Sequence, residues 1–176
     1  KEKQIHPFYG SDYGTHNPQV FLKVWKFRKE GERVPYFYVE KEYYWNSIKQ
    51  FRQKTDQEYV QDFDRFNGEE RYASIIVDPS ATSLIAALKQ TGHITRQAKN
   101  DVLPGIRMVH SLMSMGHIII NEEQCPNLID ELGVYSWDEK KVKLGQDAPI
   151  KENDHACDAL RYAITTSTSD YEVYSS

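Results

Sequence analysis

Apolar residues along this chain fall into short runs and helical repeats whose order predicts the secondary structure. Three β-branched and aromatic runs come first and predict strands around Pro7–Tyr13, Val20–Phe27 and Val34–Tyr44. A turn at Glu30–Glu32 separates the second run from the third. The first third of the chain is therefore expected to form a three-stranded antiparallel meander.

The next segment begins with a helix-start signal. Thr55 and Glu58 have the spacing of a capping box, in which the hydroxyl caps an amide and the glutamate reaches back. Aromatic residues then recur at helical spacing until Gly68. Beyond this helix, the pattern predicts strands over 72–77, 93–98 and 118–120, helices over 84–92, 102–116, 125–132 and 154–165, and a hairpin over 134–148.

This order predicts an α/β fold, because antiparallel strands come first and strands that alternate with helices follow. The ribonuclease H-like architecture has the same order, with a mixed sheet of antiparallel meander plus parallel strands, flanked by helices. Here an extra β-hairpin is expected before the last helix. We expect one domain over residues 1–166 and a polar C-terminal tail over residues 167–176.

Charge and cysteine content narrow the function classes. Residues 1–66 carry a net charge of +2 and residues 67–176 carry −6, whereas a domain that only grips DNA is normally basic. The acidic part is either a solvated surface or a set of carboxylates gathered for cations. Cys125 and Cys157 lack metal-site spacing, which argues against a disulfide framework or a zinc site and favours a reducing compartment. No apolar run is long enough to span a bilayer, so no membrane partner is expected.

Three aspartates are candidate metal ligands. Asp12 ends the first expected strand and Asp78 follows a buried one, so both belong to the sheet edge where ligands gather. Each aspartate also has a purely structural interpretation, since Asp-Tyr-Gly at Asp12 and Asp-Pro-Ser at Asp78 are common in turns and helix caps. Asp158 shares the core-facing side of the last helix with His155, where an unpaired carboxylate is costly, whereas Asp154 suits a helix cap. Three such carboxylates provide the oxygen ligands that magnesium prefers.

A family resemblance rests on segments that occur in a fixed order. They are Asp12–Thr15 with Asn17–Pro18, then Ile76–Ala81, and then Asp154–Ala163, which has the most specific pattern, D-H-A-x-D-A-L-R-Y-A. Together they resemble the nuclease half of the large terminase subunits of tailed bacteriophages. The resemblance extends roughly from Tyr9 to Ala163, which is nearly the whole chain.

The resemblance implies a ribonuclease H/integrase-like fold and a metal-dependent endonuclease that cuts concatemeric double-stranded viral DNA during genome packaging. The acidic triad of the family maps onto Asp12, Asp78 and Asp158, which would hold Mg²⁺ or Mn²⁺, expected as two ions shared through Asp12. His155 matches a histidine before the last aspartate, with a role as a neighbour of the metals, a proton carrier or a positioning group. Cutting would have little sequence specificity, because contacts to phosphate carry no base information.

The resemblance also implies the partners of this chain. They would be double-stranded DNA, the ATPase domain of the same full-length chain, the small terminase subunit and the portal of the prohead, in the cytoplasm of the host bacterium. The chain lacks a GxxxxGK[ST] phosphate-binding loop and therefore should not hydrolyse ATP. Since it begins without methionine, it is interpreted as an excised domain.

Four lysines near the last helix are candidates for DNA binding, namely Lys140, Lys141, Lys143 and Lys151. They could steer a phosphate backbone toward the acids or shield them, but ordinary surface lysines explain them equally well. Two other functions stay open. One is a resolvase-like or transposase-like nuclease on the same fold, and the other is a non-catalytic module that docks a motor onto a portal.

Overall fold

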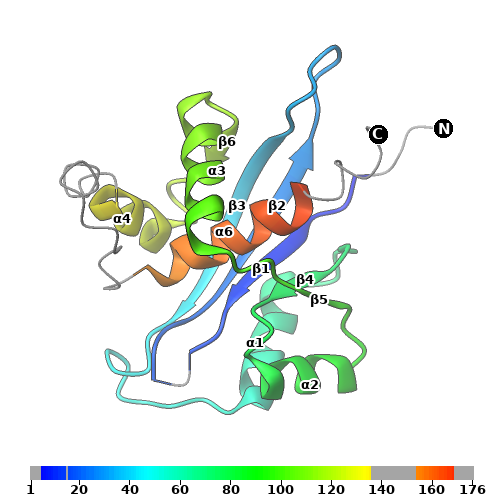
Figure 1. Ribbon diagram of the computed structural model, residues 1–176. Helices are drawn as coiled ribbons and strands as arrows, with labels where there is room; N and C mark the ends of the chain where they lie inside the picture. Colours follow the sequence, from blue (N-terminus) through cyan, green and yellow to red (C-terminus); the bar gives the residue numbers. More distant parts are fainter. Residues whose placement is uncertain (1–4, 15, 136–153, 169–176) are drawn as a thin grey trace.

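The computed structural model describes residues 5–14, 16–135 and 154–168, which form a six-stranded mixed sheet with helices on both faces (Figure 1). The strands are β1 (Phe8–Asp12), β2 (Gln19–Phe27), β3 (Tyr36–Trp45), β4 (Ile75–Val77), β5 (Thr95–Gln97) and β6 (Ile118–Ile120). The helices are α1 (Asp56–Asn67), α2 (Thr82–Gln90), α3 (Val102–Ser114), α4 (Pro126–Tyr135) and α6 (His155–Thr168).

The sheet has the strand order β5-β4-β1-β2-β3-β6. The first three strands form the predicted antiparallel meander, while β4 pairs in parallel with β1, β5 with β4, and β6 with β3. Ser11, the residue before the last one of β1, lies opposite Val77 at the end of β4. The residues that follow these two therefore leave the sheet at the same edge.

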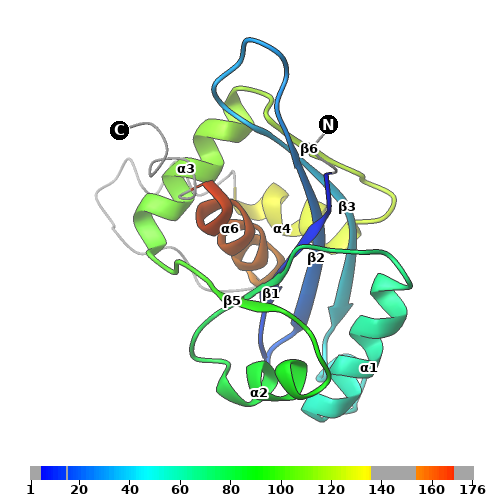
Figure 2. The ribbon, with the colours of Figure 1, turned by 90° about the vertical axis from the view of Figure 1, so that its right-hand side faces the viewer.

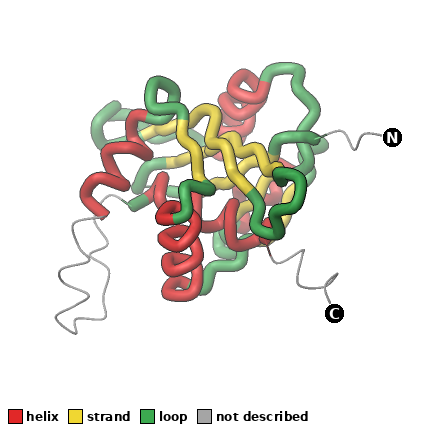
Figure 3. The backbone as a smooth tube through the Cα atoms, turned by 90° about the horizontal axis from the view of Figure 1, so that it is seen from above, coloured by secondary structure: helices red, strands yellow, loops and turns green. Residues whose placement is uncertain are grey.

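Two hydrophobic clusters cover the two faces of the sheet. Helices α3, α4 and α6 pack on one face, and α1 and α2 pack on the other (Figure 2). Viewed from above, the strands lie between these helices (Figure 3). Side chains alternate along β1, so Phe8 joins the cluster beneath α6 while Tyr9 joins the cluster beneath α1. By the same alternation, Asp12 belongs to the α6 face.

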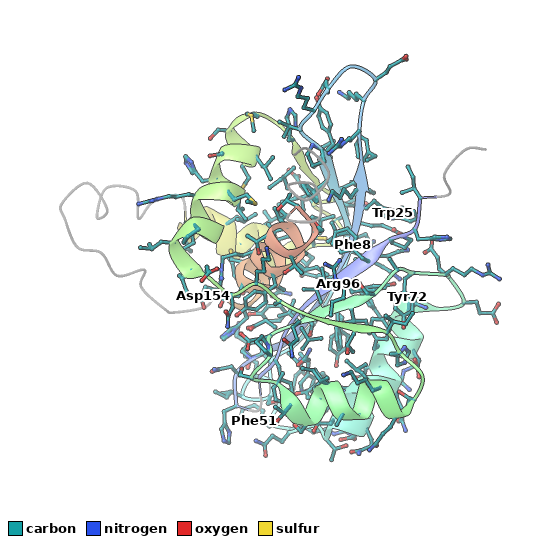
Figure 4. The ribbon with its side chains drawn as sticks, turned by 45° about the vertical axis from the view of Figure 1, so that its right-hand side comes forward. Phe8, Trp25, Phe51, Tyr72, Arg96 and Asp154 are labelled. Atoms are coloured by element: carbon teal, nitrogen blue, oxygen red, sulfur yellow. The ribbon has the colours of Figure 1, made fainter. Side chains whose placement is uncertain are left out.

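Helix α6 crosses β1 at Gly10, and the missing side chain is what allows the close approach. A Cβ atom at Gly10 would lie 2.3 Å from the carbonyl oxygen of Ala159 and 2.8 Å from the Cβ of Ala163. The helix runs antiparallel to β1, with Asp154 at its beginning and Phe8 toward its far end (Figure 4). The first turn of α6 is therefore placed beside the carboxyl end of β1.

The capping box is confirmed. The Thr55 hydroxyl accepts a hydrogen bond from the amide of Glu58, and the Glu58 carboxylate accepts one from the amide of Thr55. The mixed α/β fold is confirmed too. Among the described residues, no helix is both long and apolar enough to cross a membrane.

The structure differs from the prediction at the ends of α4 and α6. Helix α4 continues to Tyr135, so the expected hairpin is wrong at Val134, and residues 136–148 lie outside the described part of the chain. The helix extends because Leu128 and Leu132, one turn apart, anchor it on the core. Helix α6 includes Ser167 and Thr168, which the sequence assigned to the tail. Both hydroxyls donate to the carbonyl of Ile164, so this polar end remains helical.

Candidate active site

The predicted acids come from three neighbouring elements. Asp12 is the last residue of β1, and Asp78 follows β4 immediately. Asp158 lies in the first turn of α6, over the same edge of the sheet. The structure therefore brings the three segments together, as the sequence pattern suggested.

Asp12 is held by His155. The Nδ1 atom of His155 lies 2.9 Å from a carboxylate oxygen of Asp12, and the two side chains are only 17% and 13% exposed. Burial raises the pKa of Asp12 to about 6, the hydrogen bond from His155 opposes the rise, and the negative charge of Asp158 adds to it. Burial lowers the pKa of His155, but its hydrogen bond and attraction to Asp12 outweigh burial and raise it.

Asp158 is paired with Arg161 one turn later on the same helix. The guanidinium Nη2 donates to a carboxylate oxygen of Asp158 at 3.0 Å. Burial and the charge of Asp154 raise the pKa of Asp158, against the opposing effect of Arg161. The stem of Arg161 lies against Gly105 of α3, where an added Cβ would be 2.8 Å from two of its carbons. The guanidinium is thus fixed between two helices.

The Asp78 side chain both stabilises the turn after β4 and contacts helix α6. One carboxylate oxygen accepts a hydrogen bond of 2.8 Å from the amide of Ser80, and the other accepts one of 2.9 Å from the hydroxyl of Tyr162 on α6. Burial raises the pKa of Asp78, but these hydrogen bonds outweigh it and the pKa is lowered. Asp78 is therefore ionised and aimed at the helix that carries Asp158.

The three carboxylates fit a divalent cation by their chemistry. All offer hard oxygen ligands, and the charge of Asp158 raises the pKa of Asp12, so these two acids repel one another. Within the described residues, however, no three His, Cys, Asp or Glu side chains already form a set that could hold an ion. Each carboxylate is instead bonded to a protein donor. A cation would relieve the repulsion while displacing or rearranging these donors.

Three residues that contact the predicted acids or the first turn of α6 were missed by the sequence reasoning. Arg161 and Tyr162 lie within the motif that carried the resemblance, and helical spacing from Asp158 could have identified Arg161. Glu131 of α4 accepts hydrogen bonds from the first turn of α6. No local pattern marks it, because its partners are far along the chain.

The four candidate lysines, Lys140, Lys141, Lys143 and Lys151, lie outside the described residues.

The substitution Tyr162→Phe is expected to raise the pKa of Asp78, because it removes a hydrogen bond to the ionised carboxylate. The pKa can be measured by NMR titration of the Asp78 carboxyl carbon. Tyr72→Phe is the matched control, since its hydroxyl contacts His93 instead. An unchanged Asp78 pKa in Tyr162→Phe would show that this hydrogen bond is not formed in solution.

Comparisons with known proteins identify the family of this chain. A family model described as the terminase RNase H-like domain matches residues 33–166. The chain is 30% identical over 159 residues to the terminase large subunit of Escherichia phage T5, covering 88% of this chain and 34% of that protein. A structure of the large terminase from a thermophilic bacteriophage matches at 40% identity with a TM-score of 0.79, over 92% of this chain and 40% of that one.

A second similar structure is the large-terminase nuclease domain of bacteriophage SPP1 with bound Mn, at 24% identity and a TM-score of 0.58. It shares the fold, and the match covers 93% of this chain and 85% of that domain. By contrast, the chain spans well under half the length of the T5 protein and of the thermophilic phage protein. The family model covers most of the chain, including β4 and most of α6. This chain therefore belongs to the family of terminase RNase H-like domains.

Proposed function

We propose that this chain is a metal-dependent endonuclease domain that cuts concatemeric double-stranded viral DNA during genome packaging. The observation that carries the proposal is the placement of Asp12, Asp78 and Asp158 at one edge of the sheet, on β1, after β4 and on α6. Family membership supports it, because a nuclease domain of the SPP1 large terminase has the same fold.

Asp12, Asp78 and Asp158 are the residues that would hold Mg²⁺ or Mn²⁺, and the Mn bound in the SPP1 nuclease domain supports a divalent cation. Two such ions would supply positive charge for the attacked phosphate and for the departing 3′ oxygen. Asp12 is the most buried of the three and its charge is coupled to that of Asp158, so these two carboxylates would act together in holding a cation. The His155 hydrogen bond orients Asp12, which favours the positioning role for this histidine.

The wider context is also part of the proposal. DNA would be held through its phosphates, with Lys140, Lys141, Lys143 and Lys151 as candidate contacts and with little base specificity. The ATPase domain of a longer chain, the small terminase subunit and the portal of the prohead would be its partners in the host cytoplasm. A resolvase-like nuclease needs the same acids, so the DNA substrate has to separate the two functions.

The direct test is cleavage of circular duplex DNA by the isolated chain. Nicked and linear products are expected when Mn²⁺ or Mg²⁺ is added, because each proposed ligand is a hard oxygen donor. These products should disappear with excess chelator, because the chelator removes the ion. Calorimetry should show binding of Mn²⁺ in the absence of DNA. Metal-independent cutting, or no cutting with either ion, would contradict the proposal, and the second result would favour the docking module. Faster cutting of four-way junctions than of plain duplex would favour a resolvase.

A further inference from the structure

Glu131 is a buried acid on α4 whose carboxylate accepts hydrogen bonds from the backbone of another helix, α6. Only 6% of the residue is exposed. One carboxylate oxygen accepts hydrogen bonds from the backbone amides of Ala156 at 2.7 Å and Cys157 at 3.0 Å. The other accepts a hydrogen bond of 2.9 Å from the hydroxyl of Tyr44 on β3. Both oxygens are therefore used in contacts to two different elements.

The two amides belong to the first turn of α6, where backbone N–H groups have no partner within the helix. The aligned peptide dipoles also make this end of the helix partly positive, which favours a carboxylate there. A side chain just before the helix usually supplies such a cap. Here the carboxylate comes from another helix, so the position of α6 is tied to the position of α4.

Helix α4 is held at its own beginning in the same way. The carboxylate of Glu42 on β3 accepts hydrogen bonds from the amides of Asn127 at 2.7 Å and Leu128 at 2.9 Å. Two carboxylate caps therefore act in series, from β3 to α4 and from α4 to α6. The central sheet, which carries Asp12, is linked through these caps to the helix that carries Asp158.

We infer that Glu131 is a positioning residue for the proposed active site. The capped amides of Ala156 and Cys157 lie between His155 and Asp158 in sequence, so the carboxylate that binds them fixes the turn from which both side chains project. It thereby sets the distance of His155 and Asp158 from Asp12. This inference rests on the proposed nuclease function. The hydrogen bonds of Glu131 within the described part of the chain go to Tyr44, Ala156 and Cys157 and to none of the predicted ligands, so its effect is indirect.

The test compares Glu131→Ala, Glu131→Gln and Glu131→Asp with Asp62→Ala as a matched control, because Asp62 is an equally buried carboxylate on α1, on the other face of the sheet. Glu131→Ala removes the cap, Glu131→Asp keeps the carboxyl group but shortens its reach, and Glu131→Gln keeps the length and a hydrogen-bond acceptor. We expect the Mn²⁺ concentration for half-maximal cleavage to rise about 10-fold or more in the Ala and Asp variants. Glu131→Gln should restore much of the loss. Asp62→Ala should lower the melting temperature, because it removes the partner of Lys54, with little change in metal dependence.

A readout without metal separates this inference from the proposed nuclease activity. The ring ¹⁵N signals of His155 report its hydrogen bond to Asp12, and they should shift in Glu131→Ala and Glu131→Asp but much less in Asp62→Ala. If the wild type does not cut DNA, the nuclease proposal fails while this measurement still decides the positioning role. If Glu131→Ala does not fold, Glu131→Asp decides. Folded variants with unchanged His155 signals and unchanged metal dependence would overturn the inference.

Discussion

Replacing Asp158 by asparagine is expected to lower the rate of DNA cleavage by more than about 100-fold while the domain stays folded. Losing a residue that only supports a metal ligand costs roughly 10-fold to 100-fold, so losing a ligand should cost more. Asparagine has nearly the same shape and can still accept the hydrogen bond from Arg161. The rate should be measured on circular duplex DNA at saturating Mn²⁺, with circular dichroism as the check on folding.

Asp154→Asn is the matched control for this change. Asp154 lies one turn earlier, at the start of the same helix, and its charge raises the pKa of both Asp12 and Asp158. Removing that charge should alter cleavage far less than the loss of Asp158. Equal cleavage by wild type and Asp158→Asn would show that this carboxylate is not a ligand, and the assignment of the site would have to be abandoned.

Gly10→Ala is expected to destabilise the domain by about 1–3 kcal/mol, the usual cost of forcing extra atoms into a packed core. The new methyl group would meet the backbone oxygen of Ala159 at 2.3 Å, and a backbone atom cannot turn aside as a side chain can. Helix α6 would have to move away from β1, which separates Asp158 from Asp12. Denaturant unfolding measures the loss of stability, and cleavage at a temperature where the variant is folded measures the displacement.

Gly133→Ala controls for the effect of adding a methyl group to a glycine. Gly133 lies in α4, and an added Cβ would meet nothing within 4 Å. Because alanine favours helix by about 1 kcal/mol relative to glycine, this variant should be as stable as the wild type or slightly more so. A stable Gly10→Ala variant with normal cleavage would mean that the close contact between β1 and α6 does not exist in solution.

The sequence predicted the fold well because its signals were local. Each signal depends on only a few neighbouring residues: the apolar runs of the meander, the capping box at Thr55 and the glycines that end helices. The strands and helices that these signals predict are present. The end of α4 was missed because helix packing through Leu132 outweighed a strand-like pattern at Val134. The helix or strand propensity of a residue predicts its secondary structure poorly where tertiary contacts determine the conformation.

For the site, the sequence could indicate which acids end strands but not what each acid touches. The partners of Asp12 and Asp78 on α6 are separated from them by 143 and 84 residues, and no periodicity spans such distances. Glu131 is the clearest example, because its neighbours in sequence look like any amphipathic helix. The roles of Asp12, Asp78, Asp158 and His155 in binding metal stay predictions until metal and variant data are collected.

Strand β4 is only three residues long, and it carries the chain directly into Asp78. Its pairing with β1 aligns Ser11 with Val77, and side chains on a strand alternate between faces. A slip of one residue would turn Asp78 away from Tyr162 and toward the α1 face. A single insertion inside this strand would therefore turn the Asp78 carboxylate to the other face of the sheet and abolish the proposed cleavage, whereas an insertion in the turns around the strand would leave its pairing with β1 unchanged.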